Sequence, residues 1–254
     1  MTAPIARAAA TATLAIACAA PAGAEIVGEP VTYEVGGETF EGYLARNTDL
    51  AETRGLVLIV HDWDGLTEYE ERRAEMLAAR GYTAFALDVY GADVDPTTIE
   101  ENRALSGALY ADRETFRARL LGSLAAARAL DGVPQAAVVM GYCFGGAAAL
   151  EMARAGADVA GVVSFHGGLG TPEGQDYGAA AAPVLVLHGS ADPVSGMADL
   201  AALLDELQAA GVPHDAEVYG GARHSFTVWG SDDYDVEADG KAWEALTGFL
   251  DNRL

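Results

Sequence analysis

The stretch that most constrains the fold of this chain is Ala136–Gly146, with the sequence AAVVMGYCFGG. It begins with apolar, strand-like residues, and Ala147–Ala155 after it has the composition of a helix. Between them Cys143 stands at the apex of a turn with glycines on both sides, the pattern G-x-Nuc-x-G, in which Nuc is a nucleophilic residue. Such a turn holds the nucleophile in a strained backbone conformation. It also places the cysteine at a helix N-terminus, where the helix dipole favours the thiolate. Glycine neighbours allow strand and helix to pack closely. The pattern predicts a reactive cysteine, and a buried structural cysteine is the alternative that this stretch leaves open.

Strands and helices are expected to alternate along the rest of the chain. The predicted strands are 31–35, 39–46, 55–61, 82–89, 136–140, 159–165, 183–188 and 215–219, and the predicted helices are 67–80, 96–110, 113–130, 147–155, 197–210 and 236–250. Gly36-Gly37 predicts a hairpin between the first two strands. The alternation predicts an α/β fold with a mostly parallel central sheet flanked by helices on both faces. With 254 residues, of which 51% are hydrophobic, the chain fits a single domain over residues 25–254.

Residues 1–24 differ in composition from the rest of the chain. Arg7 supplies a positive charge, Ala8–Ala20 an apolar segment and Ala22-Gly23-Ala24 an A-x-A cleavage pattern. We interpret the segment as a secretory signal peptide cleaved after Ala24, which predicts a periplasmic or secreted protein. The apolar run is too short to span a membrane. A disordered alanine-rich leader or a misassigned start codon is the alternative interpretation.

Charge and cysteine content limit the partners of the chain. A net charge of −23 argues against nucleic acids and anionic membrane surfaces as partners, and we expect a monomer or a weak homodimer. Cleavage of the leader would remove Cys18 and leave Cys143 as the only cysteine, so that no intramolecular disulfide could form. A lipoprotein signal through Cys18 is disfavoured by Ala15, where such signals usually carry leucine.

Two further loops contain the partners that a nucleophilic Cys143 needs. Asp192 follows the predicted strand 183–188, and His224 follows the predicted strand 215–219 on a glycine-rich loop. Ligands bind at the carboxyl ends of parallel strands, and the order nucleophile, acid, histidine is that of the α/β-hydrolase triad. We predict that His224 accepts the proton of Cys143, while Asp192 fixes the tautomer of His224. A simple turn residue and an ordinary histidine are the alternatives.

The turn at 61–65, with the sequence HDWDG, predicts the position of the oxyanion hole, the pair of backbone N–H groups that would stabilise the negatively charged oxygen of the intermediate. In this arrangement it supplies one oxyanion-hole N–H, here that of Trp63, and the residue after the nucleophile, Phe144, supplies the second. A metal site made of His61, Asp62 and Asp64 is disfavoured, because adjacent residues in a turn seldom converge on one ion. We expect neither a metal nor a cofactor.

Together these motifs resemble the dienelactone hydrolases, the carboxymethylenebutenolidase-like proteins. The resemblance covers most of the mature chain and is carried by GYCFGG at 141–146, HGSADP at 188–193, RHSF at 223–226, and HDWDG at 61–65 with the helix that follows it. It implies an α/β-hydrolase fold and a cofactor-free hydrolase with the triad Cys143, Asp192 and His224. It also implies an acidic residue, usually glutamate, that helps to ionise the thiol when substrate binds. Asp62 matches that position but is one methylene shorter, and a turn-capping carboxylate is its alternative role.

The substrate is less constrained by the sequence. Dienelactone hydrolases hold a substrate carboxylate with two arginines; Arg103 is a candidate for one, with a surface arginine as the alternative, and Val228 occupies the position of the other. Ser225, beside His224, is a further candidate contact. We therefore predict hydrolysis of small esters or lactones, with thioesters as a third class, through an acyl-enzyme on Cys143. A non-catalytic binding protein of the same fold and a thiol-based redox sensor, here without a resolving cysteine, are the alternatives.

Overall fold

The computed structural model describes residues 25–254, so that the predicted signal peptide at 1–24 lies outside the described residues. One eight-stranded sheet has the order β1-β2-β4-β3-β5-β6-β7-β8. Its strands are β1 (Ile26–Val35), β2 (Glu38–Asn47), β3 (Leu56–Val60), β4 (Thr83–Leu87), β5 (Ala137–Tyr142), β6 (Gly161–Phe165), β7 (Val184–Gly189) and β8 (His214–Tyr219). The expected hairpin of β1 and β2 is antiparallel and adds to β4, whereas β3 to β8 are parallel. The predicted mostly parallel sheet is confirmed.

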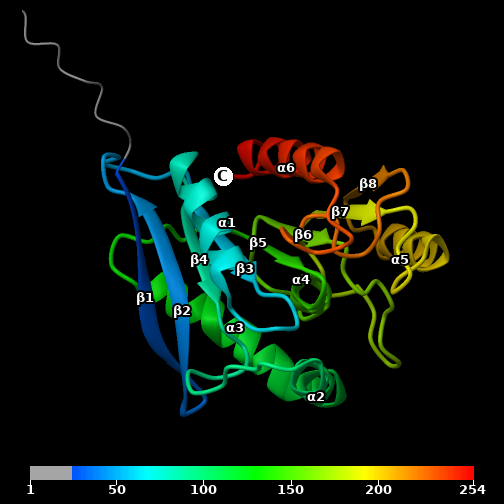
Figure 1. Ribbon diagram of the computed structural model, residues 1–254, viewed down its shortest axis with the longest axis horizontal. Coiled ribbons are helices and arrows are strands. Elements are labelled where there is room, and N and C mark those ends of the chain that lie inside the picture. Colours follow the sequence, from blue (N-terminus) through cyan, green and yellow to red (C-terminus); the bar gives the residue numbers. More distant parts are fainter. Residues whose placement is uncertain (1–24) are drawn as a thin grey trace, which may run out of the picture.

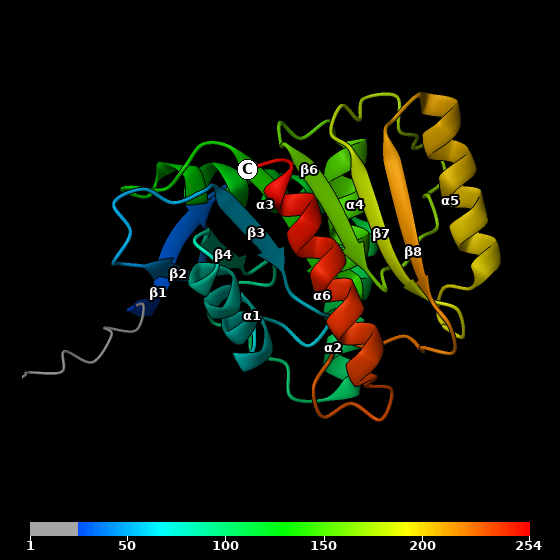
Figure 2. The ribbon, with the colours of Figure 1, turned by 90° about the horizontal axis from the view of Figure 1, so that it is seen from above.

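Helices cover both faces of this sheet (Figures 1 and 2). They are α1 (Glu68–Ala79), α2 (Ile99–Ala111), α3 (Arg113–Ala129), α4 (Phe144–Arg154), α5 (Met197–Ala210) and α6 (Val236–Asp251). The buried residues of α1 and α6 pack in one hydrophobic core, and those of α3, α4 and α5 pack in a second. None of the helices within 25–254 is long and apolar enough to cross a membrane.

The strand β3 shows why the central strands are apolar throughout. All five of its residues are buried. Leu58 and Val60 pack in the core with α3 and α4, while Val57 and Ile59 pack in the core with α1 and α6. A parallel strand covered on both faces needs apolar side chains at every position.

Helix starts differ from prediction where caps or turns decide them. The helix predicted from residue 96 begins at Ile99, because Thr98 is its N-cap and Glu101 completes a capping box. The helix predicted from residue 147 begins at Phe144, immediately after the turn apex. Its first turn therefore lies against the carboxyl ends of the central strands.

The turn at Cys143 depends on its glycines. Cys143 has φ 50° and ψ −107°, a backbone conformation that residues other than glycine rarely adopt. A Cβ on Gly145 would lie 2.1 Å from the carbonyl oxygen of Val60, and one on Gly141 would lie 2.2 Å from that of Gly145. The start of α4 thus sits almost in backbone contact with β3, which projects Cys143 beyond the edge of the sheet.

Candidate active site

The carboxyl edge of the sheet brings together the three residues that the sequence nominated as a triad. Cys143 lies between β5 and α4, Asp192 in the loop after β7, and His224 in the loop after β8. His224 Nε2 lies 2.9 Å from the Sγ of Cys143, and His224 Nδ1 lies 2.8 Å from Asp192 Oδ2. We call Cys143, His224 and Asp192 the candidate triad.

The carboxylate of Asp192 is held by the backbone of its own loop as well as by the imidazole of His224. Its Oδ1 accepts the backbone N–H groups of Val194 at 2.8 Å and Ser195 at 3.1 Å. Burial by itself would raise the pKa of Asp192, but the hydrogen bonds from His224 and from these N–H groups hold that pKa below its usual value. An ionised Asp192 requires the proton on Nδ1 of His224, so that the neutral imidazole offers Nε2 as the acceptor toward the thiol.

The thiol of Cys143 is protonated in this resting arrangement. Part of the residue remains accessible, yet burial raises the pKa of the thiol well above its ordinary value, and the nearby carboxylate of Asp62 raises it further. The sequence predicts the opposite direction from the helix N-terminus alone. Loss of solvation and a neighbouring negative charge therefore outweigh the effect of the helix dipole on the pKa of this thiol.

Asp62 lies in the turn after β3 and contacts both the thiol and the predicted oxyanion hole. Its Oδ1 accepts the N–H of Trp63, and its own N–H donates to Glu70 at 3.3 Å. Burial and the neighbouring charge of Asp64 raise the pKa of Asp62 to about 6. The Phe144 N–H faces the sulfur of Cys143. The Trp63 N–H, the first of the two predicted oxyanion donors, is therefore engaged by the carboxylate of Asp62 in the resting site.

His61, which the sequence offered as a metal ligand, has both ring nitrogens occupied by backbone. Nδ1 contacts the carbonyl oxygen of Asp62 at 2.5 Å, and Nε2 accepts the N–H of Val89 at 3.3 Å. Burial lowers the pKa of His61, which keeps the ring neutral. Across residues 25–254 no three side chains of metal-binding type converge on one point.

An aromatic wall beside Cys143 was not predicted from the sequence. The ring of Phe144 lies 5.3 Å from that of Tyr110 and 5.8 Å from that of Tyr90, measured between centroids. The hydroxyl of Tyr90 donates to the carbonyl oxygen of Trp63 at 2.9 Å, which ties the wall to the oxyanion turn. Tyr90 follows β4, so its place after a strand could have identified it, whereas nothing in the helical spacing marks Tyr110.

The predicted substrate contacts are only partly brought to the candidate triad. Ser225 is half-buried beside His224. Arg103 is exposed on α2, and its guanidinium makes no hydrogen bond or ion pair with any residue of the described chain. Val228, where a second arginine is expected in dienelactone hydrolases, is half-buried. The structure therefore shows a contact surface with less positive charge than a paired arginine clamp.

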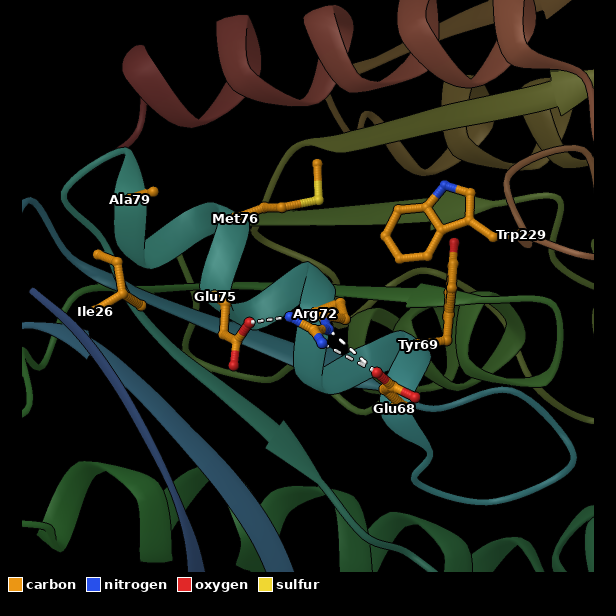
Figure 3. Close-up of a pocket in the computed structure, with 8 residues that line it drawn as sticks. All are labelled: Ile26, Glu68, Tyr69, Arg72, Glu75, Met76, Ala79 and Trp229. Atoms are coloured by element: carbon orange, nitrogen blue, oxygen red, sulfur yellow. Dashed lines mark hydrogen bonds and ion pairs between the residues drawn. The ribbon is translucent and has the colours of Figure 1, made fainter. Parts of the chain in front are cut away.

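A separate groove of about 800 Å³ lies over α1 (Figure 3). Its lining contains none of the candidate triad and consists of Ile26, Glu68, Tyr69, Arg72, Glu75, Met76, Ala79 and Trp229. Tyr69 and Trp229 form its aromatic end, with their ring centroids 5.0 Å apart. Tyr69 connects this groove to the residues around Cys143: its hydroxyl hydrogen-bonds to Thr227, and its ring centroid lies 5.0 Å from that of Tyr142, the residue before Cys143.

The sheet order, the strained turn after β5 and the loops after β7 and β8 define the α/β-hydrolase fold. The model of the dienelactone hydrolase family matches residues 40–254. The chain belongs to the dienelactone hydrolase family and is a carboxylic ester hydrolase. Membership confirms the resemblance carried by the sequence motifs.

Solved structures show the same architecture. A dienelactone hydrolase-like promiscuous phosphotriesterase, P91, from metagenomic libraries is 30% identical, with 91% of this chain and 99% of that chain covered and a TM-score of 0.84. A dienelactone hydrolase from Anabaena variabilis (20% identity, 90% and 99% covered, TM-score 0.67) and a cold-adapted esterase from an Arctic intertidal metagenomic library (20%, 90% and 94%, 0.67) share the fold. No curated protein matches the chain.

Proposed function

We propose that this chain hydrolyses small uncharged esters and lactones through a covalent acyl-enzyme on Cys143. The observation that carries the proposal is the position of His224, whose imidazole bridges the Sγ of Cys143 at 2.9 Å and the carboxylate of Asp192 at 2.8 Å. A nucleophile, a base and a group that orients the base are the minimum set for acyl transfer by a side chain.

In the proposed first step, the sulfur of Cys143 attacks the ester carbonyl carbon as its proton passes to Nε2 of His224. The C–O bond of the tetrahedral intermediate then breaks, and His224 returns the proton to the departing alkoxide. Water, deprotonated by the same nitrogen, attacks the thioester, and the acid product leaves with Cys143 restored. In a lactone the leaving oxygen stays attached to the acyl group, and the product is one hydroxy acid.

We assign Asp62 a part in forming both the thiolate and the oxyanion hole. Its carboxylate contacts the thiol and accepts the Trp63 N–H, so that a bound carbonyl oxygen has to replace it. Displacement would free the Trp63 amide to act with that of Phe144, and the loss of one such donor typically costs about 3 kcal/mol. The raised pKa of Asp62, about 6, allows its carboxylate to take the thiol proton near neutral pH and to pass it on to Nε2 of His224, the acceptor in the first step.

Uncharged substrates are favoured by the surroundings of the site. The aromatic wall of Tyr90, Tyr110 and Phe144 suits apolar acyl groups. Val228 leaves one position of an arginine pair without charge, and a net charge of −23 repels anions. Arg103 is retained as a candidate contact with the distal part of the substrate, and Ser225 as one near His224.

Cleavage of aryl phosphotriesters is a second candidate activity, favoured by the 30% identity to a phosphotriesterase over nearly the whole chain. The sulfur of Cys143 would attack phosphorus, and the aryloxide would leave with the proton carried by His224. Water would then hydrolyse the phosphorothioate on the enzyme. Turnover beyond one equivalent of aryloxide per chain separates this activity from simple inactivation of the thiol.

The two other readings of the site make different predictions. A binding protein of this fold would not turn over any ester. A redox sensor needs a thiolate that oxidants reach, whereas burial and Asp62 raise the pKa of the Cys143 thiol, and no second cysteine lies within 25–254 to resolve a sulfenic acid. The raised pKa of the thiol and the lack of a second cysteine within 25–254 therefore favour the hydrolase over the redox sensor.

Export and assembly are part of the proposal. We expect a periplasmic or secreted monomer or weak homodimer that begins at Glu25. N-terminal sequencing of protein exported by a Gram-negative host should return a chain starting near Glu25; an intact Met1 on folded protein from the native cytoplasm would reject export. Sedimentation velocity over a range of concentrations measures the assembly state, and a stable larger oligomer would contradict it.

The proposed activity is tested with a panel of short-chain aryl esters, lactones and thioesters, each measured for kcat/KM with the parent chain and with Cys143→Ala. The proposal expects turnover of uncharged esters and lactones that disappears in the variant. No turnover of any member of the panel by correctly folded protein would reject the proposal.

A further inference from the structure

A second histidine lies directly behind the nucleophile turn. His166 follows β6 and is fully buried, and its ring centroid lies 5.5 Å from that of His224. Its φ is 37°. Among the residues of 25–254 other than glycine, His166 and Cys143 alone have a positive φ. The two residues follow neighbouring parallel strands, paired at Tyr142 and Phe165. A buried side chain in a conformation that glycine would adopt more easily points to a role for the imidazole.

The imidazole of His166 contacts the backbone of the nucleophile. The N–H of Cys143 donates to Nδ1 of His166 at 3.2 Å and also to the carbonyl oxygen of Phe165 at 3.0 Å. Because Nδ1 accepts an N–H, it carries no proton, and the ring proton is therefore on Nε2. Nε2 lies 2.8 Å from the Oγ1 of Thr227, which accepts that proton in a hydrogen bond.

Thr227 is itself held from several sides. Its Oγ1 lies 2.8 Å from the hydroxyl of Tyr69, and its carbonyl oxygen accepts from Arg73 at 2.9 Å. Arg73 in turn pairs with Asp239 of α6 at 2.6 Å. The acceptor of the His166 proton is therefore anchored between α1 and α6, the two helices on one face of the sheet.

We propose that His166 is a positioning residue for Cys143: as the Nε2–H tautomer fixed by Thr227, it accepts the Cys143 N–H and holds the strained apex in line with His224. The inference rests on the proposed function for its effect on turnover. Burial and the adjacent His224 keep the pKa of His166 well below its usual value, in agreement with a ring that stays neutral while His224 carries the proton in the reaction.

The test compares His166→Asn with His166→Leu in the chain from Glu25. Asparagine tolerates positive φ and places an acceptor oxygen near the position of Nδ1, whereas leucine offers no acceptor. We expect His166→Leu to lower kcat about 10- to 100-fold with KM within about twofold, and His166→Asn to stay within about threefold of the parent. His214→Asn, at the opposite edge of the sheet at the start of β8, is the matched control and should leave kcat unchanged.

Thr227→Val keeps the test decisive if His166→Leu does not fold. Without the threonine oxygen the ring proton can move to Nδ1, where it opposes the Cys143 N–H, so that kcat should fall about threefold to tenfold while Thr227→Ser retains it. The inference is overturned if folded His166→Leu or Thr227→Val matches the parent, or if His166→Asn loses as much as His166→Leu.

A second readout separates this inference from the proposed function. Cys143 is the only cysteine from residue 25 onward, so iodoacetamide alkylation followed by mass spectrometry reports its presentation without any ester. The alkylation rate should fall in His166→Leu and remain near the parent value in His166→Asn. If the parent hydrolyses no ester but the alkylation rates follow this order, the proposed function fails and the positioning role stands; equal rates in all variants reject the positioning role.

Discussion

The carboxyl edge of the sheet and the groove over α1 both combine aromatic and acidic side chains, but they differ in how those groups are held. In the groove, Arg72 pairs with Glu68 at 3.1 Å and Glu75 at 3.4 Å, all on one exposed helix face (Figure 3). At the edge, the candidate triad comes from three separate loops and is fixed by buried hydrogen bonds. The proposed active site is therefore assigned by the convergence of buried polar groups from distant segments, and not by the volume of a groove.

The largest effect is expected from removal of the nucleophile at the edge. Cys143→Ala should lower kcat for a model aryl ester by about a thousandfold or more without changing the circular dichroism spectrum, because alanine lacks the sulfur on which the proposed acyl-enzyme forms. Cys143→Ser should keep part of the activity, since His224 can also activate a hydroxyl. Near-parental turnover by the alanine variant would show that Cys143 is not the nucleophile.

The orienting carboxylate gives the next largest effect. Asp192→Asn keeps the shape of the side chain but favours the wrong tautomer of His224, and we expect kcat to fall about a thousandfold. Asp205→Asn, on the exposed face of α5, is the matched control. If Asp192→Asn and Asp205→Asn behave alike in a stopped assay of initial rates, the pairing of Asp192 with His224 has no catalytic consequence.

The pH profile tests the role of Asp62. Burial and Asp64 raise the pKa of Asp62 to about 6, so its carboxylate is protonated below this pH and can accept a proton only above it. We therefore expect kcat/KM to rise with pH through about 6. Asp62→Asn should remove this limb and lower kcat/KM about tenfold.

Asp64→Asn provides the complementary test, because it removes one of the charges that raise the pKa of Asp62. The rising limb should move to lower pH in this variant, with little change in the plateau. A limb that stays in place in both variants would assign it to another group and leave Asp62 as a turn-capping carboxylate.

Substrate charge is expected to have a smaller effect. A carboxylate lacking one charge-assisted partner loses about 2 kcal/mol, a factor of about thirty, so kcat/KM should favour a neutral ester over its carboxylate-bearing analogue by roughly this factor. Val228→Arg should reduce the preference. A clear preference of the parent chain for the carboxylate at both low and high salt would contradict the prediction and make Arg103 the first residue to replace.

The smallest effect is expected in the groove. Arg72→Ala breaks two exposed ion pairs and should leave kcat and KM for the same ester within about twofold of the parent, because no buried group depends on them. A loss comparable to that of the edge variants would mean that the two regions are coupled and would remove the contrast between them.

The sequence could identify the strands and the candidate triad because each triad residue follows a predicted strand and lies in a loop with glycine or proline. Cys143 and Asp192 follow the buried strands β5 and β7, whereas His224 follows the largely exposed edge strand β8. His166 has the same pattern, followed by Gly167 and Gly168, but its importance depends on Thr227, 61 residues further on. The direction of the Cys143 pKa shift could not be predicted either. It depends on the burial of the thiol and on Asp62, which only the folded chain brings beside it.

The central claim, a covalent intermediate on Cys143, is tested most directly by trapping it. An aryl ester with a good leaving group makes acylation fast, so that the acyl-enzyme accumulates during turnover. Acid quenching within the first turnover, followed by peptide mass spectrometry, should show a burst of about one phenolate per chain and the acyl mass on the peptide that contains Cys143. Steady turnover with Cys143 unmodified and the acyl group on another residue would contradict the account.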